Sequence, residues 1–118
     1  MSKQFRLKAS EIRSLVEGYG ACLASDHITV DGKRVGFMYR EAVDGPHDGG
    51  WRFFSGEESQ AYTDDPDNWA LYDVNTIANY DPTIIPYLDS PAGSAFGRGA
   101  DAAWRAEPMP TDLPTDSD

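Results

Sequence analysis

The chain has 118 residues, a single cysteine (Cys22), and a net charge of −10 from 20 acidic and 10 basic residues. Its length suits one ordinary domain, and a hydrophobic share of 40% with 12% aromatic residues excludes a disordered composition. A single cysteine excludes an internal disulfide and a thiolate metal site. The sequence has no long apolar run, which argues against a signal peptide or a membrane span, and we therefore expect a cytoplasmic protein.

The charge is unevenly distributed along the chain. Residues 1–40 carry seven Lys or Arg and four Asp or Glu, whereas residues 41–118 carry three Arg and sixteen Asp or Glu. No basic residue lies between Arg52 and Arg98. Such a surface repels nucleic acid and anionic membranes and favours a basic partner. The alternative is that the acidic residues serve only solubility.

Local patterns predict one helix and three strands in the first part of the chain. Ser10 is a suitable N-cap for a helix that runs to Tyr19 with apolar residues at helical spacing. Asp31-Gly32 is the turn signal of a hairpin between the second and third strands. The expected strands are Ala21–Ser25, Ile28–Val30 and Val35–Glu41.

The rest of the chain predicts further strands, joined by turns and short helices. Residues 44–50 form a loop by composition, and a brief helix follows the capping pair Asp81-Pro82. A short helix is also expected at Glu57–Tyr62. The expected strands are Trp51–Ser55, which pairs antiparallel with Val35–Glu41, then Ala70–Val74, Ser94–Phe96 and Ala103–Arg105.

These elements predict a single α+β domain over residues 1–107, with a mainly antiparallel sheet and a few short helices. Residues 108–118, PMPTDLPTDSD, are polar, acidic and rich in proline. We expect this segment to be a flexible tail.

The adjacent carboxylates Glu57 and Glu58 raise the question of catalysis. Neighbouring residues point to opposite faces of a strand and lie about 100° apart on a helix. Paired acid and base carboxylates must instead converge across a substrate. We therefore expect the two residues to lie on the surface, where they open a helix after Gly56 ends the strand.

The cluster Asp64, Asp65 and Asp67 raises the question of a divalent cation. A calcium loop that starts at Asp65 would have Trp69 in fifth place and Ala70 where glycine is required. The pattern fails, so we expect a solvated acidic turn and no metal.

No other group of residues completes a catalytic site. His27 and His47 each lie beside an aspartate in loop-like sequence, and Cys22 lies in an apolar strand. Ser55 lacks the flanking pattern of a nucleophile elbow. We therefore expect neither an enzyme nor a cofactor, although residues distant in sequence leave an enzyme open as a third hypothesis.

Arg40 and Arg52 stand on apolar strands in a chain with few cations. An arginine lays its stem on an apolar face and offers its guanidinium to carboxylates. We expect both to be structural residues, paired within the sheet with Glu41 or Asp73. The alternative is that they line a groove.

Four segments resemble bacterial immunity protein family thirty-three, formerly a domain of unknown function. The resemblance covers residues 20–105 and rests on long, unusual motifs. They are VGFMYREAVD (35–44), DGGWRFFSGEES (48–59), DDPDNWALYDVNTIANYDPTIIPYLDSP (64–91) and GSAFGR (93–98).

The resemblance implies a role in polymorphic toxin systems, in which a small cytoplasmic protein binds a toxin and protects the cell without catalysis. A toxin with a basic active-site cleft would suit the acidic half of the chain. A module that binds a small molecule or peptide in an apolar pocket above Arg40 or Arg52 is the alternative. The expected contact residues are Glu57, Glu58, Asp64, Asp65, Asp67, Trp69, Tyr80 and Asp81.

Overall fold

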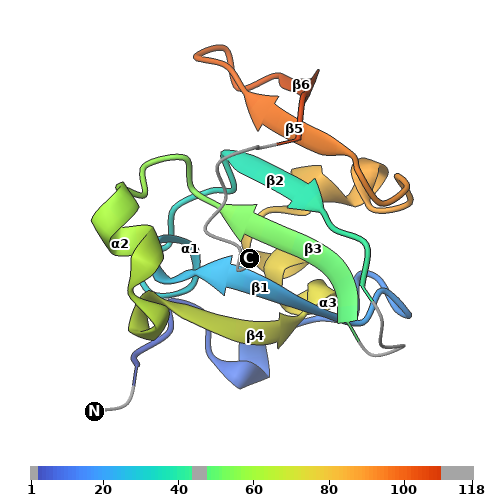
Figure 1. Ribbon diagram of the computed structural model, residues 1–118. Coiled ribbons are helices and arrows are strands. Elements are labelled where there is room, and N and C mark those ends of the chain that lie inside the picture. The colour runs from blue at the N-terminus through green and yellow to red at the C-terminus, as the bar shows by residue number, and fades with distance from the viewer. Residues whose placement is uncertain (1–2, 44–47, 110–118) are drawn as a thin grey trace.

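The computed structural model describes residues 3–43 and 48–109 (Figure 1). The loop segment 44–47 with His47, and the expected tail beyond Met109, lie outside the described residues. The described chain forms one six-stranded sheet with helices packed on one face (Figure 1).

The sheet is mixed but mainly antiparallel. The strands lie side by side in the order β4-β1-β3-β2-β5-β6. Only β1 and β3 pair in parallel, and the other neighbours are antiparallel. The expected α+β class is confirmed. The strands are β1 (Ala21–Ser25), β2 (Phe37–Arg40), β3 (Asp48–Phe54), β4 (Trp69–Asp73), β5 (Ala95–Arg98) and β6 (Trp104–Glu107).

Among the described residues there are six short helical elements, one before β1 and five between strands. They are the α-helices α1 (Asp26–Thr29), α2 (Gln60–Asp64) and α3 (Val74–Tyr80), and the 3-10 helices η1 (Ala9–Glu11), η2 (Pro66–Asn68) and η3 (Pro82–Tyr87). The helix expected after Asp81-Pro82 is η3, and the Asp81 carboxylate caps it by accepting the Thr83 N–H. Helix α3 is missing from the prediction, because Val74 was assigned to the preceding strand.

The core lies between the inner face of the sheet and the pair α3 and η3. Trp51 and Phe53 of β3 are fully buried there, and their rings stack with centroids 5.9 Å apart. From α3, Val74, Ile77 and Ala78 are buried at positions i, i+3 and i+4, which is the spacing of one helix face. Burial of these side chains is what positions the connections at the ends of the sheet.

The predicted helix from Ser10 to Tyr19 is wrong. Beyond η1 the segment has no regular structure, because two asparagine side chains of α3 take the hydrogen bonds that a helix would make internally. The Asn75 Oδ1 accepts the N–H groups of Leu15 and Val16 at 2.8 and 3.1 Å. The Arg13 carbonyl accepts the amide N–H of both Asn75 and Asn79.

The predicted hairpin around Asp31-Gly32 is also wrong. Its first arm is the single turn α1, which begins where the Ser25 hydroxyl accepts the His27 N–H. Ile28 and Thr29 of this turn are fully buried, so the apolar run indicated burial and not a strand. Gly32 has a φ of +78°, a conformation that favours glycine.

Candidate functional site

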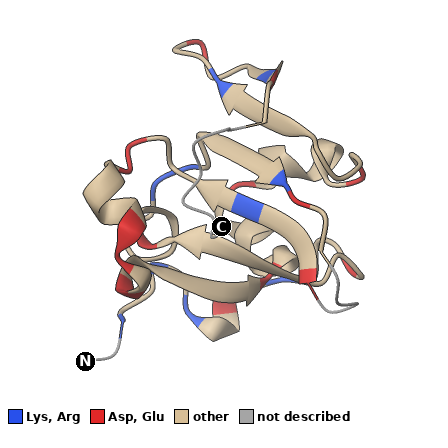
Figure 2. Cartoon of the chain, viewed as in Figure 1, with Lys and Arg blue, Asp and Glu red and all other residues tan. Residues whose placement is uncertain are grey.

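The connection from β3 to β4 gathers the expected carboxylates at one end of the sheet. Figure 2 shows acidic residues on the loop that leaves β3 and around the end of α2. Glu57, Asp64, Asp65 and Asp67 are exposed there, and we call these four residues the acidic rim. Lys33 lies 3.0 Å from Glu57, but both side chains are well exposed, so this ion pair contributes little to stability.

Local hydrogen bonds hold the side chains of two of the three aspartates of the acidic rim. Asp65 accepts the Asp67 N–H at 2.9 Å and so caps η2, and Asp64 accepts the amide of Gln60 at 2.9 Å. Within residues 3–43 and 48–109, none of the three pairs with a Lys or Arg. Their negative charge is therefore exposed and available to a partner.

Glu58 turns inward and does not belong to the acidic rim. Its carboxylate accepts the Ser55 N–H at 2.9 Å, the Ser55 hydroxyl at 2.8 Å and the Gly56 N–H at 3.0 Å. Burial alone would raise the pKa of Glu58, but hydrogen bonds from Ser25 and Ser55 lower it below its ordinary value. This closed turn delays the helix expected from Glu57, so α2 begins only at Gln60.

Replacing Glu58 with glutamine is expected to lower the free energy of unfolding by about 1–2 kcal/mol near pH 7, because charge-assisted hydrogen bonds are lost. The folded-state pKa lies below the ordinary value of 4.5, so this contribution is present above pH 4.5 and is lost as the pH falls through the folded-state pKa. Urea unfolding at several pH values measures it.

The control for this prediction is Glu57→Gln at the exposed neighbour, which is expected to change stability by less than about 0.5 kcal/mol. The stability difference between wild type and Glu58→Gln should close in acid. A difference that stays constant down to about pH 3 would contradict the assigned role of the Glu58 carboxylate.

A row of aromatic rings in contact with one another holds this connection on the sheet. His27 stacks on Tyr62 with ring centroids 4.2 Å apart, and Tyr62 meets Trp69 edge-on at 6.4 Å. Trp69 in turn meets Phe54 at 5.0 Å, and its indole N–H donates to the Thr63 carbonyl. These rings come from α1, α2, β4 and β3, and no pattern in the sequence indicates that they meet.

Tyr80 and Asp81, which we expected in the contact surface, both make contacts inside the chain. The Tyr80 hydroxyl donates to the Thr29 carbonyl at 3.0 Å and accepts the Leu7 N–H at 3.1 Å. Asp81 is only 5% exposed. Its carboxylate pairs with Arg98 at 2.6 Å and accepts the Val35 N–H at 3.0 Å, so it is not available to a partner.

Arg52 forms the ion pair with Glu41 that the sequence suggested, at 2.8 Å, and a second one with Asp48 at 3.0 Å. Its side chain is 13% exposed, and its hydrogen bonds hold the pKa of Asp48 below the ordinary value. Arg40 binds carbonyl groups instead, donating to those of Gly49 at 2.9 Å and Ser90 at 2.7 Å.

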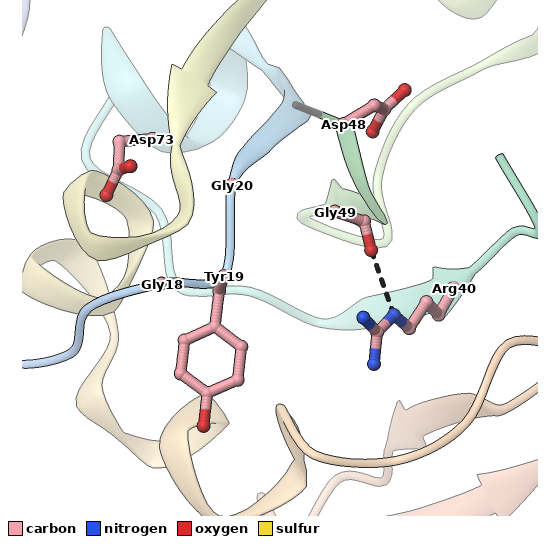
Figure 3. Close-up of a pocket in the computed structure, with 7 residues that line it drawn as sticks. All are labelled: Gly18, Tyr19, Gly20, Arg40, Asp48, Gly49 and Asp73. Atoms are coloured by element: carbon pink, nitrogen blue, oxygen red, sulfur yellow. Dashed lines mark hydrogen bonds between the residues drawn. The ribbon is translucent and has the colours of Figure 1, made fainter. Parts of the chain in front are cut away.

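An open cleft of about 450 Å³ lies beside Arg40 (Figure 3). Its other lining residues are Gly18, Tyr19, Gly20, Asp48, Gly49 and Asp73. A Cβ on Gly49 would approach the Tyr19 carbonyl oxygen to 2.0 Å, so glycine lets the two walls meet. The lining is polar, unlike the apolar pocket that a module for small molecules would need.

The residues considered for chemistry have other roles. Cys22 is fully buried, which raises the pKa of its thiol far above the ordinary value and makes it unreactive. The His27 Nδ1 lies 2.8 Å from an Asp31 carboxylate oxygen. Within the part of the chain that the structure describes, no three His, Cys, Asp or Glu side chains gather in a way that suits a metal ion.

Comparison with known families identifies the domain. A family model described as the immunity protein Imm33 domain matches residues 22–107. The chain belongs to this family. The match runs from β1 to the end of β6, so the acidic rim and the aromatic row lie inside the Imm33 domain. The resemblance stated from the sequence is thereby confirmed.

No curated protein and no solved structure matches this Imm33 domain. Among the described residues, there is no helix with the length and apolar character needed to span a membrane.

Proposed function

We propose that this Imm33 domain neutralises a cognate toxin by binding it through the acidic rim and the neighbouring Trp69, without catalysis. Membership of an immunity protein family supports binding to a toxin in general. The observation that carries the finer proposal is the set of exposed aspartates on the β3–β4 connection, which no Lys or Arg of the described residues neutralises. Inhibition of this kind needs only tight binding.

The charge of the rim indicates the kind of surface it would bind. Asp64, Asp65 and Asp67 lie within four positions of each other, so their potentials add. A toxin that acts on nucleic acid has a basic substrate cleft, which an acidic surface can occupy after electrostatic steering. We therefore propose a toxin with a basic cleft as the partner, encountered in the cytoplasm.

The aromatic row supplies the rigid backing that such a contact needs. Trp69 is partly exposed, and its indole N–H donates to a carbonyl group inside the chain. Tryptophan held in this way next to charged residues is typical of the residues that contribute most to binding. Because Tyr62 and Phe54 pack against its ring, little side-chain freedom is lost on association.

The decisive experiment is co-expression of this chain with the polypeptide encoded by the neighbouring gene. The expected result is rescue of growth from a toxic neighbour, together with co-purification of the two chains. A neighbour that is toxic but neither bound nor inhibited would overturn the proposal.

A further inference from the structure

Strand β4 is an outer edge of the sheet, beside the acidic rim. It pairs with β1 on one side and with no described strand on the other. An edge strand presents unpaired N–H and C=O groups that can accept a further strand. The direction of each group along β4 decides whether such an edge is open.

The hydrogen-bond pattern shows which groups of β4 face outward. The Val74 N–H donates to the Gly20 carbonyl, so these two residues form a hydrogen-bonded pair. Bonded and non-bonded pairs alternate along an antiparallel ladder. The pair of Leu71 with Leu23 is therefore a non-bonded one, and the N–H and C=O of Leu71 point away from β1.

The start of the edge is closed and its centre is open. The Trp69 N–H donates to the Pro66 carbonyl, and the Trp69 carbonyl accepts the Lys3 ammonium at 3.3 Å. Among the described residues, no such bond involves the backbone of Leu71, whose side chain is 70% exposed. Leu71 thus offers a backbone donor, a backbone acceptor and an apolar side chain at one place.

The two edges of the sheet differ in how they are protected. Charged residues on an edge strand discourage pairing with other chains. At the far edge, β6 carries Arg105 and Glu107 within its four residues. The centre of β4 has the sequence Ala70-Leu71-Tyr72 without a charge or proline, so β4 is the edge suited to a partner.

The charges beside β4 specify the partner's chemistry. Asp65 and Asp67 precede the strand, Asp73 ends it, and all three are exposed. A segment laid along the edge would run from one acidic group to the other. Lys or Arg near its two ends and an apolar residue at its centre would complement both features. A second copy of this chain would carry the same acidic groups and a charge of −10.

We propose that the toxin inserts an extended basic segment along the free edge of β4, pairing its backbone with Leu71 and its cationic side chains with Asp65, Asp67 and Asp73. This inference rests on the proposed function and names the structural mode of the contact. Affinity comes from the added backbone hydrogen bonds, and the choice of partner comes from the acidic flanks.

The test measures the affinity of the purified polypeptide encoded by the neighbouring gene for the Leu71→Pro variant and for the Ala106→Pro variant. Proline at Leu71 removes an outward N–H without breaking the β1 ladder. Ala106 on the opposite edge strand β6 is the matched control. The Gly99 N–H donates to the Ala103 carbonyl, so these two residues form a hydrogen-bonded pair. Because bonded and non-bonded pairs alternate along the β5–β6 ladder, Ala106 is in a non-bonded pair with Phe96 and its N–H points outward. We expect Leu71→Pro to weaken binding at least about tenfold and Ala106→Pro to leave it unchanged.

Amide hydrogen exchange of the wild-type protein gives a second readout that does not depend on a variant that folds. The Leu71 amide should exchange more slowly in the complex, while the Ala106 amide should not change. Equal binding by Leu71→Pro, or an unprotected Leu71 amide, would overturn edge pairing and leave the proposed function standing. If the wild-type protein fails to bind the neighbouring polypeptide, both edge pairing with a toxin and the proposed function are wrong. If the wild type forms a dimer that Leu71→Pro abolishes, a second copy of this chain, and not a toxin, pairs with the β4 edge.

Discussion

Replacing Asp81 with alanine is expected to lower the free energy of unfolding by about 3–5 kcal/mol, the largest loss of stability that we expect for a single charged residue of this chain. Asp81 is 5% exposed and pairs with the almost fully buried Arg98 at 2.6 Å. Its removal leaves that guanidinium without a counter-charge and the Val35 N–H without an acceptor. Chemical denaturation measures the effect.

The matched control for Asp81→Ala is Asp64→Ala on the acidic rim, which is expected to change stability by less than about 0.5 kcal/mol. The variant Arg98→Met and the double variant complete a mutant cycle. If Asp81→Ala costs less than about 1 kcal/mol, Asp81 is not the buried anchor that its contacts indicate.

Reversing the acidic rim is expected to weaken toxin binding by about 100-fold, mainly through slower association. The change is Glu57, Asp64, Asp65 and Asp67 to lysine, at four exposed positions. The affinity of the wild type should fall as salt is added, whereas that of the variant should not, because the favourable charge contacts are gone. Surface plasmon resonance at several salt concentrations separates the rates.

The control reverses four exposed carboxylates away from the rim, which are Glu11, Glu17, Asp101 and Glu107. Both variants have the same net charge, so only the position of the reversed charges differs. The control is expected to keep most of the affinity. Equal loss in both variants would show that net charge alone attracts the toxin, and unchanged binding in the rim variant would remove the rim from the interface.

Local chemistry was enough to predict most of the sheet. Ala21–Ser25 was predicted with the bounds that β1 has. The predicted strand Trp51–Ser55 overlaps β3, which begins earlier, at Asp48 in the predicted loop 44–50, and ends at Phe54. Both are short apolar or aromatic runs bounded by turn residues, for which strand propensity and burial agree. The cap at Asp81 was also local, because its carboxylate meets the Thr83 N–H two residues further on.

The failed helix prediction has a clear physical cause, which is competition from residues distant in the chain. The segment after η1 has the spacing of a helix, but Asn75 and Asn79 bind its backbone from α3. Helix periodicity reports only which residues face an apolar surface, and a short helix is too weak to resist such competition. The buried turn α1 was predicted as a strand for a different reason, since burial alone does not specify the backbone.

Some features of the acidic rim could be predicted from the sequence, and others required the tertiary structure. From the sequence alone follow the acidic composition of the β3–β4 connection and the failure of its aspartates to fit a calcium loop. These depend on residue type and spacing within a few positions. Only the tertiary structure decides that Asp81 is engaged inside the chain while Glu57 and Asp64 remain exposed, because Asp81 is held by the distant residues Arg98 and Val35. The Glu58 carboxylate is engaged as well, but by its near neighbours Ser55 and Gly56.

The position of β4 at the edge of the sheet could not be predicted from the sequence and is seen only in the tertiary structure. The sequence Trp69–Asp73 indicates a strand, but strand order depends on which other strand pairs with each side. Such pairing is set by contacts between residues far apart, here Leu71 beside Leu23. The sequence by itself therefore determined the charge and most of the strands, and the tertiary structure alone decided which backbone groups and carboxylates are free to meet a partner.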